Sequence, residues 1–145
     1  MQILGMLKTD PETEANPPPP DPGLMARMGD FVEEATKAGV LLASNGLHPS
    51  AKGKRIKLAG GKMTITDGPF TESKELVSSF ALFQVKSMDE AVHWTTRFLE
   101  ILGKGECELR PIFELADFPD DLLSPEQVEQ ENATRRQMER NAARR

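Results

Sequence analysis

The chain has 145 residues, of which 38% are hydrophobic and 28% charged, and this length and composition predict one soluble domain with a buried core. The net charge of −5 is unevenly spread: residues 132–145 carry five arginines against one glutamate, which leaves −9 for residues 1–131. An acidic body argues against general nucleic-acid binding, which needs a positive surface to displace phosphate counterions.

The sequence shows no sign of a membrane segment, a disulfide or a bound cofactor. Nowhere do about eighteen apolar residues run together, and the apolar stretch near the N-terminus lacks a basic flank. The single cysteine, Cys107, cannot form an internal disulfide. There is no G-x-G-x-x-G fingerprint and no carboxylate–histidine set with metal spacing. We therefore expect a cytoplasmic protein without signal peptide, membrane contact, metal or cofactor.

The first third of the chain predicts a strand, a loop, a helix and a second strand. Residues 2–8 favour a strand, and residues 9–21 hold five prolines and few apolar groups, which predicts a loop. Asp21 and Pro22 are typical of an N-cap and first turn, and apolar residues then recur at helical spacing as far as Gly39. Residues 40–45 predict the next strand.

A basic β-hairpin is predicted next. Residues 54–58 and 62–66 flank Ala59-Gly60-Gly61, and glycine supplies the positive φ that a tight turn requires. A solvated hairpin is one interpretation of its charge, and an anion-binding rim is the other. The basic residues are Lys52, Lys54, Arg55, Lys57 and Lys62.

Residues 77–113 predict a strand, a helix and a strand. Residues 77–85 alternate, but Phe80 and Leu82 make the second face apolar as well, so both faces are expected to be buried. Ser87 caps a helix with an apolar inner line, and Trp94 lies off that line, where we expect it to cover a sheet edge or a partner. A final strand alternates apolar Cys107, Leu109 and Phe113 with charged residues.

The order βαβ, β-hairpin, βαβ predicts an α+β, ferredoxin-like protomer over residues 1–116 with its helices on one sheet face. Two helices cannot cover both faces, so the apolar second face predicts a homodimer packed sheet to sheet. Residues 117–145 are predicted to form a C-terminal extension. There Ser124 caps a marginal, exposed helix, and Glu131 is spaced to pair with Arg135.

The stretch TDGPFTESKE, residues 66–75, combines turn formers with four ionisable side chains. Asp67, Gly68 and Pro69 account for a tight corner by themselves. They do not account for the residues that follow, which are Phe70, Glu72, Lys74 and Glu75. Three interpretations stay open: a structural turn, a ligand pocket with Asp67 as acid or base, and an intersubunit salt-bridge network.

The two histidines are too far apart in the sequence to form a local metal pair. His93 lies on the second long helix and is predicted to be a surface or boundary residue. His48 stands at a strand end beside Pro49 and is the better candidate for a cleft.

DGPFTESKE at 67–75 resembles the signature of the DGPF-type YCII-related proteins. Three flanking stretches are similar to the same family: AGVLLASNGLHPS at 38–50, SSFALFQVKSMDEAV at 78–92 and ELRPI at 108–112. The resemblance covers about residues 1–113. It implies a dimeric α/β-barrel of ferredoxin-like protomers, and for members encoded beside sigma factors it implies a regulatory or stress-linked partner.

The resemblance also implies a site. In wider relatives a His–Asp pair in a cleft beside the sheet is regarded as catalytic, and one branch removes chloride from an aromatic-derived ring. The motif match makes Asp67 the acid or base. The histidine of the first helix has no counterpart, because Arg27 and Met28 occupy that region, so His48 is the substitute. The implied substrate-binding residues are Phe70, Glu72, Lys74, Glu75 and Arg110.

Two functional hypotheses follow. The first is a small-molecule-binding protein or enzyme, with Asp67 as general acid or base in a cleft and Lys74 or Arg110 holding a small anionic or aromatic ligand. The second is a noncatalytic dimeric regulatory module that binds another protein through residues 124–145.

Overall fold

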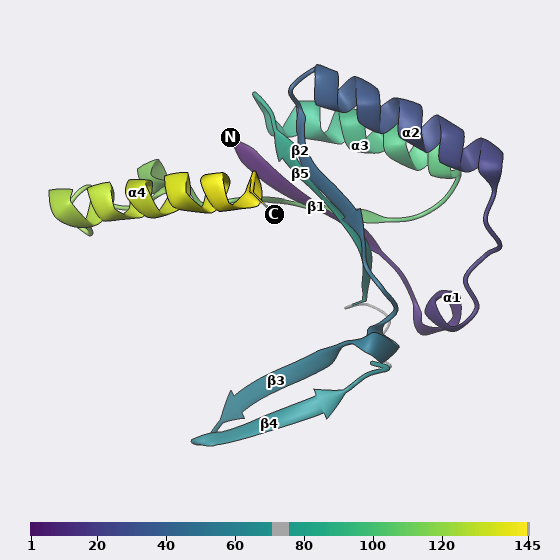
Figure 1. Ribbon diagram of the computed structural model, residues 1–145, viewed down its shortest axis with the longest axis horizontal. Helices are drawn as coiled ribbons and strands as arrows, with labels where there is room; N and C mark the ends of the chain where they lie inside the picture. The colour runs from purple at the N-terminus through teal and green to yellow at the C-terminus, as the bar shows by residue number, and fades with distance from the viewer. Residues whose placement is uncertain (71–75, 145) are drawn as a thin grey trace. The chain divides into compact units, whose positions relative to one another are not determined.

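A four-stranded antiparallel sheet with two long helices on one face forms most of the N-terminal part of the computed structural model (Figure 1). The structure describes residues 1–70 and 76–144. The chain divides into two compact units, Met1–Ile112 and Phe113–Arg145. The mixed α+β architecture predicted from the sequence is therefore confirmed.

The strand order of the main sheet is β2–β5–β1–β6, and every neighbouring pair is antiparallel. The strands are β1 (Gln2–Lys8), β2 (Leu41–Gly46), β5 (Val77–Gln84) and β6 (Cys107–Pro111). Strands β1 and β5, the first and third of these four in chain order, occupy the centre of the sheet. Because side chains alternate along a strand, Ile3 of β1 and its partner Phe83 of β5 point to one face and both are buried there.

Both long helices start where the sequence predicts. In α2 (Pro22–Lys37) the Asp21 carboxylate accepts a hydrogen bond from the Gly23 amide at 2.9 Å. In α3 (Met88–Leu102) the Ser87 hydroxyl accepts from the Glu90 amide at 3.2 Å. The two helices lie side by side over the same face of the sheet (Figure 1).

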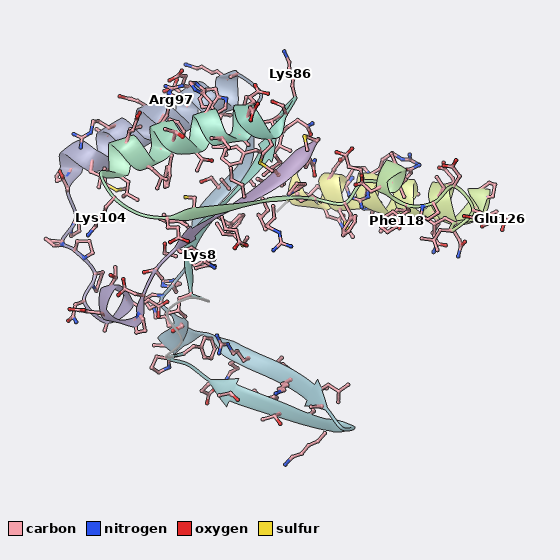
Figure 2. The ribbon with its side chains drawn as sticks, turned by 180° about the vertical axis from the view of Figure 1, so that it is seen from behind. Lys8, Lys86, Arg97, Lys104, Phe118 and Glu126 are labelled. Atoms are coloured by element: carbon pink, nitrogen blue, oxygen red, sulfur yellow. The ribbon has the colours of Figure 1, made fainter. Side chains whose placement is uncertain are left out.

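Aromatic rings join the two helices inside the core. Trp94 is buried, with its ring centroid 5.8 Å from that of Phe31 on α2. The expectation that Trp94 covers a sheet edge or a partner is therefore wrong: one helical turn brings it onto the inner stripe with Ala91. Arg97, labelled in Figure 2, places its guanidinium 4.8 Å from the Trp94 ring and donates to both carboxylate oxygens of Glu34, at 3.0 and 2.6 Å.

The proline-rich segment 9–21 is not wholly a loop. A five-residue helix, α1 (Pro11–Ala15), begins after Asp10, whose carboxylate accepts from the Thr13 amide at 2.8 Å. Asp10-Pro11 repeats the cap-and-proline pattern of Asp21-Pro22, and that local signal outweighs the loop character of the neighbouring prolines.

The far face of the main sheet carries apolar side chains that neither α2 nor α3 covers. Leu4 of β1 pairs with Leu82 of β5, and both alternate with the buried Ile3 and Phe83. Met6, two residues along β1, lies on the same face. All three far-face side chains are half-buried within the described chain.

The hairpin is a second, separate sheet of β3 (Lys54–Ala59) and β4 (Lys62–Asp67). Gly60 and Gly61 form its turn with φ of 56° and 75°, in the left-handed region that favours glycine. Every residue of both strands is exposed.

The second unit contains a short 3-10 turn, Leu115–Asp117, and α4 (Pro125–Ala142). The predicted cap is confirmed, since the Ser124 hydroxyl accepts from the Gln127 amide at 3.2 Å. The predicted pairing of Arg135 with Glu131 is also present, at 2.9 Å. No described residue of α4 is buried. Across the described chain, none of the helices combines the length and apolarity of a membrane span.

Candidate functional site

A cavity of about 240 Å³ lies between the two long helices and the main sheet. Strands β1, β2 and β5 and the first residue of β6 provide its floor, while α2 and α3 provide its roof. Most of the lining is apolar, including Leu7, Met28, Phe31, Val32, Phe83 and Phe98. A mostly apolar cleft with a few polar groups, here partly open to solvent, is the usual form of a small-molecule site.

Small residues on the sheet make room for the cavity. Strand register aligns Ser44 of β2, Ala81 of β5 and Gly5 of β1 in one row across the sheet, and all three line the space. A methyl group on Gly5 would lie 3.0 Å from Cε2 of Phe83, so the row has no spare room for a larger side chain at that point. The helices pack on the sheet around this row, where Phe31 and Trp94 share one buried cluster with Ile3 and Phe83.

Thr95 of α3 is one of the lining residues, and its hydroxyl group has no hydrogen-bond partner among the described residues. The residue is 8% exposed, and its Oγ1 is buried and unpaired within the described residues. Threonines in helices usually donate to the carbonyl four residues earlier. Thr96 does so at 2.8 Å and Thr36 at 2.7 Å, but Thr95 does not. A buried hydroxyl without a partner destabilises the folded state by about 1–3 kcal/mol, and a ligand that forms a hydrogen bond with it removes this destabilisation.

Cys107, the first residue of β6, also lines the cavity. Burial raises the pKa of its thiol, because desolvation penalises the thiolate. The thiol is therefore neutral at pH 7. Cys107 is the sole ionisable side chain among the described lining residues, and no Lys, Arg or His is available there to pair with a ligand anion.

The predicted acid or base, Asp67, stands elsewhere. It ends β4, is exposed, and forms an ion pair with Lys54, its cross-strand partner at the base of the hairpin. It is not among the residues that line the cavity. A catalytic role for Asp67 stays a prediction, while its described contact is that of a surface salt bridge.

The described part of TDGPFTESKE is a tightly packed corner. A methyl group on Gly68 would lie 1.8 Å from the Ser50 carbonyl oxygen, so no other residue fits without backbone movement. The Ser50 hydroxyl accepts from the Phe70 amide at 3.0 Å and donates to Glu14 at 2.6 Å. The Arg55 guanidinium lies 4.1 Å from the centre of the Phe70 ring. Phe70 thus has a structural partner in the hairpin, and the Gly68-Pro69 peptide is cis.

The remaining predicted site residues are not brought to the cavity. His48 is exposed and does not line it. Arg110 on β6 is exposed, lies on the far face of the sheet and is 3.6 Å from Glu108. The other predicted residues, Glu72, Lys74 and Glu75, fall outside the described residues.

Sequence reasoning missed the cavity itself. One signal was present: Gly5 interrupts an otherwise apolar strand, and glycine in a strand marks a close approach of another group. The roles of Thr95 and Cys107 could not be found in this way, because only the strand register and the helix packing bring them to the same space.

Comparisons with known proteins give a family and similar solved structures. The model of the YCII-related domain matches residues 1–116. A structure of 5-chloro-2-hydroxyhydroquinone dehydrochlorinase from Burkholderia phenoliruptrix AC1100, in complex with 2,5-dihydroxybenzoquinone, aligns over 82% of this chain and 100% of that chain. Its TM-score is 0.41 at 12% identity, so this likeness supports no inference about ligand or activity. No curated protein matches the chain.

Proposed function

The chain belongs to the YCII-related domain family, and we propose that within this fold it acts as a small-molecule-binding protein or enzyme whose ligand occupies the cavity between the helices and the sheet. The observation that carries the proposal is a mostly apolar space of about 240 Å³ whose lining includes Thr95, a residue with a buried hydroxyl that is unpaired within the described residues. A stable core would fill such a space with side chains, and a cavity with an unsatisfied polar group has a cost that bound ligand removes.

The volume favours a compact ligand. A cavity of about 150 Å³ holds benzene, and one water molecule takes about 30 Å³ of liquid. A space of about 240 Å³ therefore suits a substituted single ring or a branched aliphatic compound of similar bulk.

The lining selects a neutral ligand. A buried anion without a cationic partner pays a large desolvation cost. No cationic side chain is among the described lining residues, so of the two predicted ligand types the aromatic one fits the cavity and the anionic one does not. Thr95 then forms one hydrogen bond to a carbonyl, ether or hydroxyl oxygen of the ligand.

The test is a thermal-shift screen of neutral single-ring compounds against their carboxylated counterparts, since a ligand that binds only the native state raises the melting temperature. Val32→Phe places a larger side chain in the cavity and should abolish the shift. Val92→Phe makes the same change at an exposed position of α3 and should leave the shift intact. Equal shifts in both variants would place the ligand elsewhere and defeat the proposal.

Asp67→Asn separates binding from turnover. Because Asp67 does not line the cavity, the variant should bind ligand as well as wild type. Loss of turnover with binding kept would support the acid–base prediction for Asp67. If Asp67→Asn converts a bound compound at the wild-type rate, Asp67 is not the acid or base.

We also propose that the protomer is ferredoxin-like and pairs into a dimeric α/β-barrel. The sheet order β2–β5–β1–β6 supports the first part, since it is the 4-1-3-2 order of that fold once the hairpin is set aside. The half-buried, helix-free face around Leu4, Met6 and Leu82 supports the second. Analytical ultracentrifugation at micromolar concentration tests it, and a monomer would overturn it.

The second candidate function, a noncatalytic module acting through residues 124–145, is supported by α4, where no described residue is buried and Met138 is 63% exposed. More exposed apolar surface precedes the tail. Phe113 is 71% exposed and stacks on Phe118 at 5.5 Å between centroids. Phe118 is labelled in Figure 2. Deletion of residues 124–145 should abolish partner capture while leaving ligand shifts unchanged. If capture persists without them, the tail is not the contact.

A further inference from the structure

The β3–β4 hairpin has one apolar face that nothing in the described chain covers. Strand register pairs Ile56 with Ile65 and Leu58 with Met63, so these four side chains lie together on one face. Each is between 56% and 69% exposed. The opposite face is polar, with Lys57 paired to Thr64. An apolar face opposite a polar face is typical of a strand pair that buries one face and exposes the other to solvent.

The hairpin is held firmly at its base. The Gly68 amide donates to the Gly53 carbonyl at 3.0 Å, and Lys54 forms an ion pair with Asp67. Arg55 lies over the Phe70 ring. A free two-stranded hairpin is only marginally stable in water, so an anchored one with an uncovered aliphatic face requires a partner surface.

Charge indicates which partner. Residues 52–67 carry five basic side chains against Asp67, a net +4, whereas the rest of the chain carries −9. A basic hairpin is attracted to the acidic body of another copy of the same chain and is repelled by another hairpin. The acidity of the remainder also opposes docking of the whole chain on an anionic membrane.

The area that a dimer needs points to the same partner. Four strands about 4.8 Å apart and five to eight residues long give a flat sheet face of roughly 300–500 Å². A stable interface buries about 800 Å² on each partner. One face of a two-stranded, six-residue hairpin adds roughly 200 Å², and in a two-fold dimer each copy both offers and receives one. The two contributions together approach the required area.

We propose that the β3–β4 hairpin is a dimerisation arm whose apolar face packs against the body of a second copy of this chain. The inference rests on the proposed homodimer and deepens it, because it assigns a large part of the interface to a segment outside the main sheet. Each arm lies on the other copy in an isologous, two-fold arrangement.

The decisive experiment changes only the apolar face of the arm. Ile56→Thr combined with Ile65→Thr removes apolar surface but keeps β-branched side chains, and the exposure of both sites predicts an unchanged melting of the protomer core. The matched control is Thr64→Ser with Thr66→Ser on the opposite face. Sedimentation equilibrium should show the dimer dissociation constant raised on the order of tenfold or more in the first variant and unchanged in the control.

The other outcomes are equally informative. A dimeric wild type whose dissociation constant is unaffected by the isoleucine changes would overturn the arm and leave the sheet-to-sheet dimer standing. A monomeric wild type would overturn both, and flotation with phosphatidylserine vesicles would then show whether the hairpin is a membrane contact.

One further measurement separates arm-on-body from arm-on-arm packing. Leu58→Cys in a Cys107→Ser background should not form an intermolecular disulfide on mild oxidation, because the two arms lie on opposite bodies. Rapid formation of a dimer linked at this position would refute the arrangement.

Discussion

Replacement of Thr95 by valine tests the cavity most directly. Valine has nearly the shape of threonine but no hydroxyl, so the change removes the buried unpaired Oγ1 and leaves the packing in place. An unsatisfied buried polar group costs about 1–3 kcal/mol, and Thr95→Val should therefore stabilise the free protein by an amount in this range. At this chain length, a gain of 1 kcal/mol raises the melting temperature by about 3 °C.

The ligand reverses the sign of this effect. A bound molecule that accepts from Thr95 stabilises wild type by a hydrogen bond worth about 0.5–1.5 kcal/mol, which the valine variant cannot form. Differential scanning calorimetry should thus show Thr95→Val melting above wild type without ligand and gaining less from ligand. Thr95→Ser keeps the hydroxyl and should retain the ligand response. A clear loss of stability in the free valine variant would show that the hydroxyl is satisfied, and the reasoning would fail.

Three other predictions follow from described contacts. Gly68→Ala should destabilise the protein by about 2 kcal/mol or more, because the added methyl group would lie 1.8 Å from a backbone carbonyl oxygen. Gly29→Ala, at an open position of a helix, should instead stabilise it by about 0.5–1 kcal/mol. Urea denaturation of the two variants measures both free energies of unfolding. Alkylation of Cys107 by iodoacetamide should be slow at pH 7 and accelerate only in alkaline solution, because burial raises its pKa, and a cavity ligand should protect it. Hydrogen bonding to Arg97 lowers the pKa of Glu34. The stability contributed by that pair is therefore present above the ordinary carboxyl pKa and is lost as the pH falls through the lowered pKa. Glu34→Gln should thus lower the melting temperature at pH 7 and have no effect on it in strong acid.

Much of the secondary structure could be predicted because its signals are local. The caps at Asp21, Ser87 and Ser124 are single side chains that accept from backbone amides two or three residues away, and each was found where expected. The glycine pair of the hairpin turn is equally local. The error at Trp94 has a different origin. The apolar stripe of a helix is broad enough to include Trp94, and only the position of Phe31 on the other helix decides which face of α3 is buried.

The candidate site could not be predicted in the same way. The most distinctive sequence motif, at 66–75, left a structural turn, a ligand pocket and a salt-bridge network open, and its described residues form a corner around Ser50 and a surface ion pair. The cavity instead collects residues from four strands and two helices that are distant in sequence. Periodicity identifies the faces of each element and does not say where two faces leave a gap.

The sequence by itself determined the α+β class, the capped helices, the hairpin and an apolar second sheet face, because each depends on side chains within a few positions of one another. Only the tertiary structure decided that Ser44, Ala81 and Gly5 share one row and that Thr95, with its unpaired hydroxyl, lines the same cavity. Register and helix packing are set by the sum of many long-range contacts, and a cavity exists only where that sum leaves space unfilled.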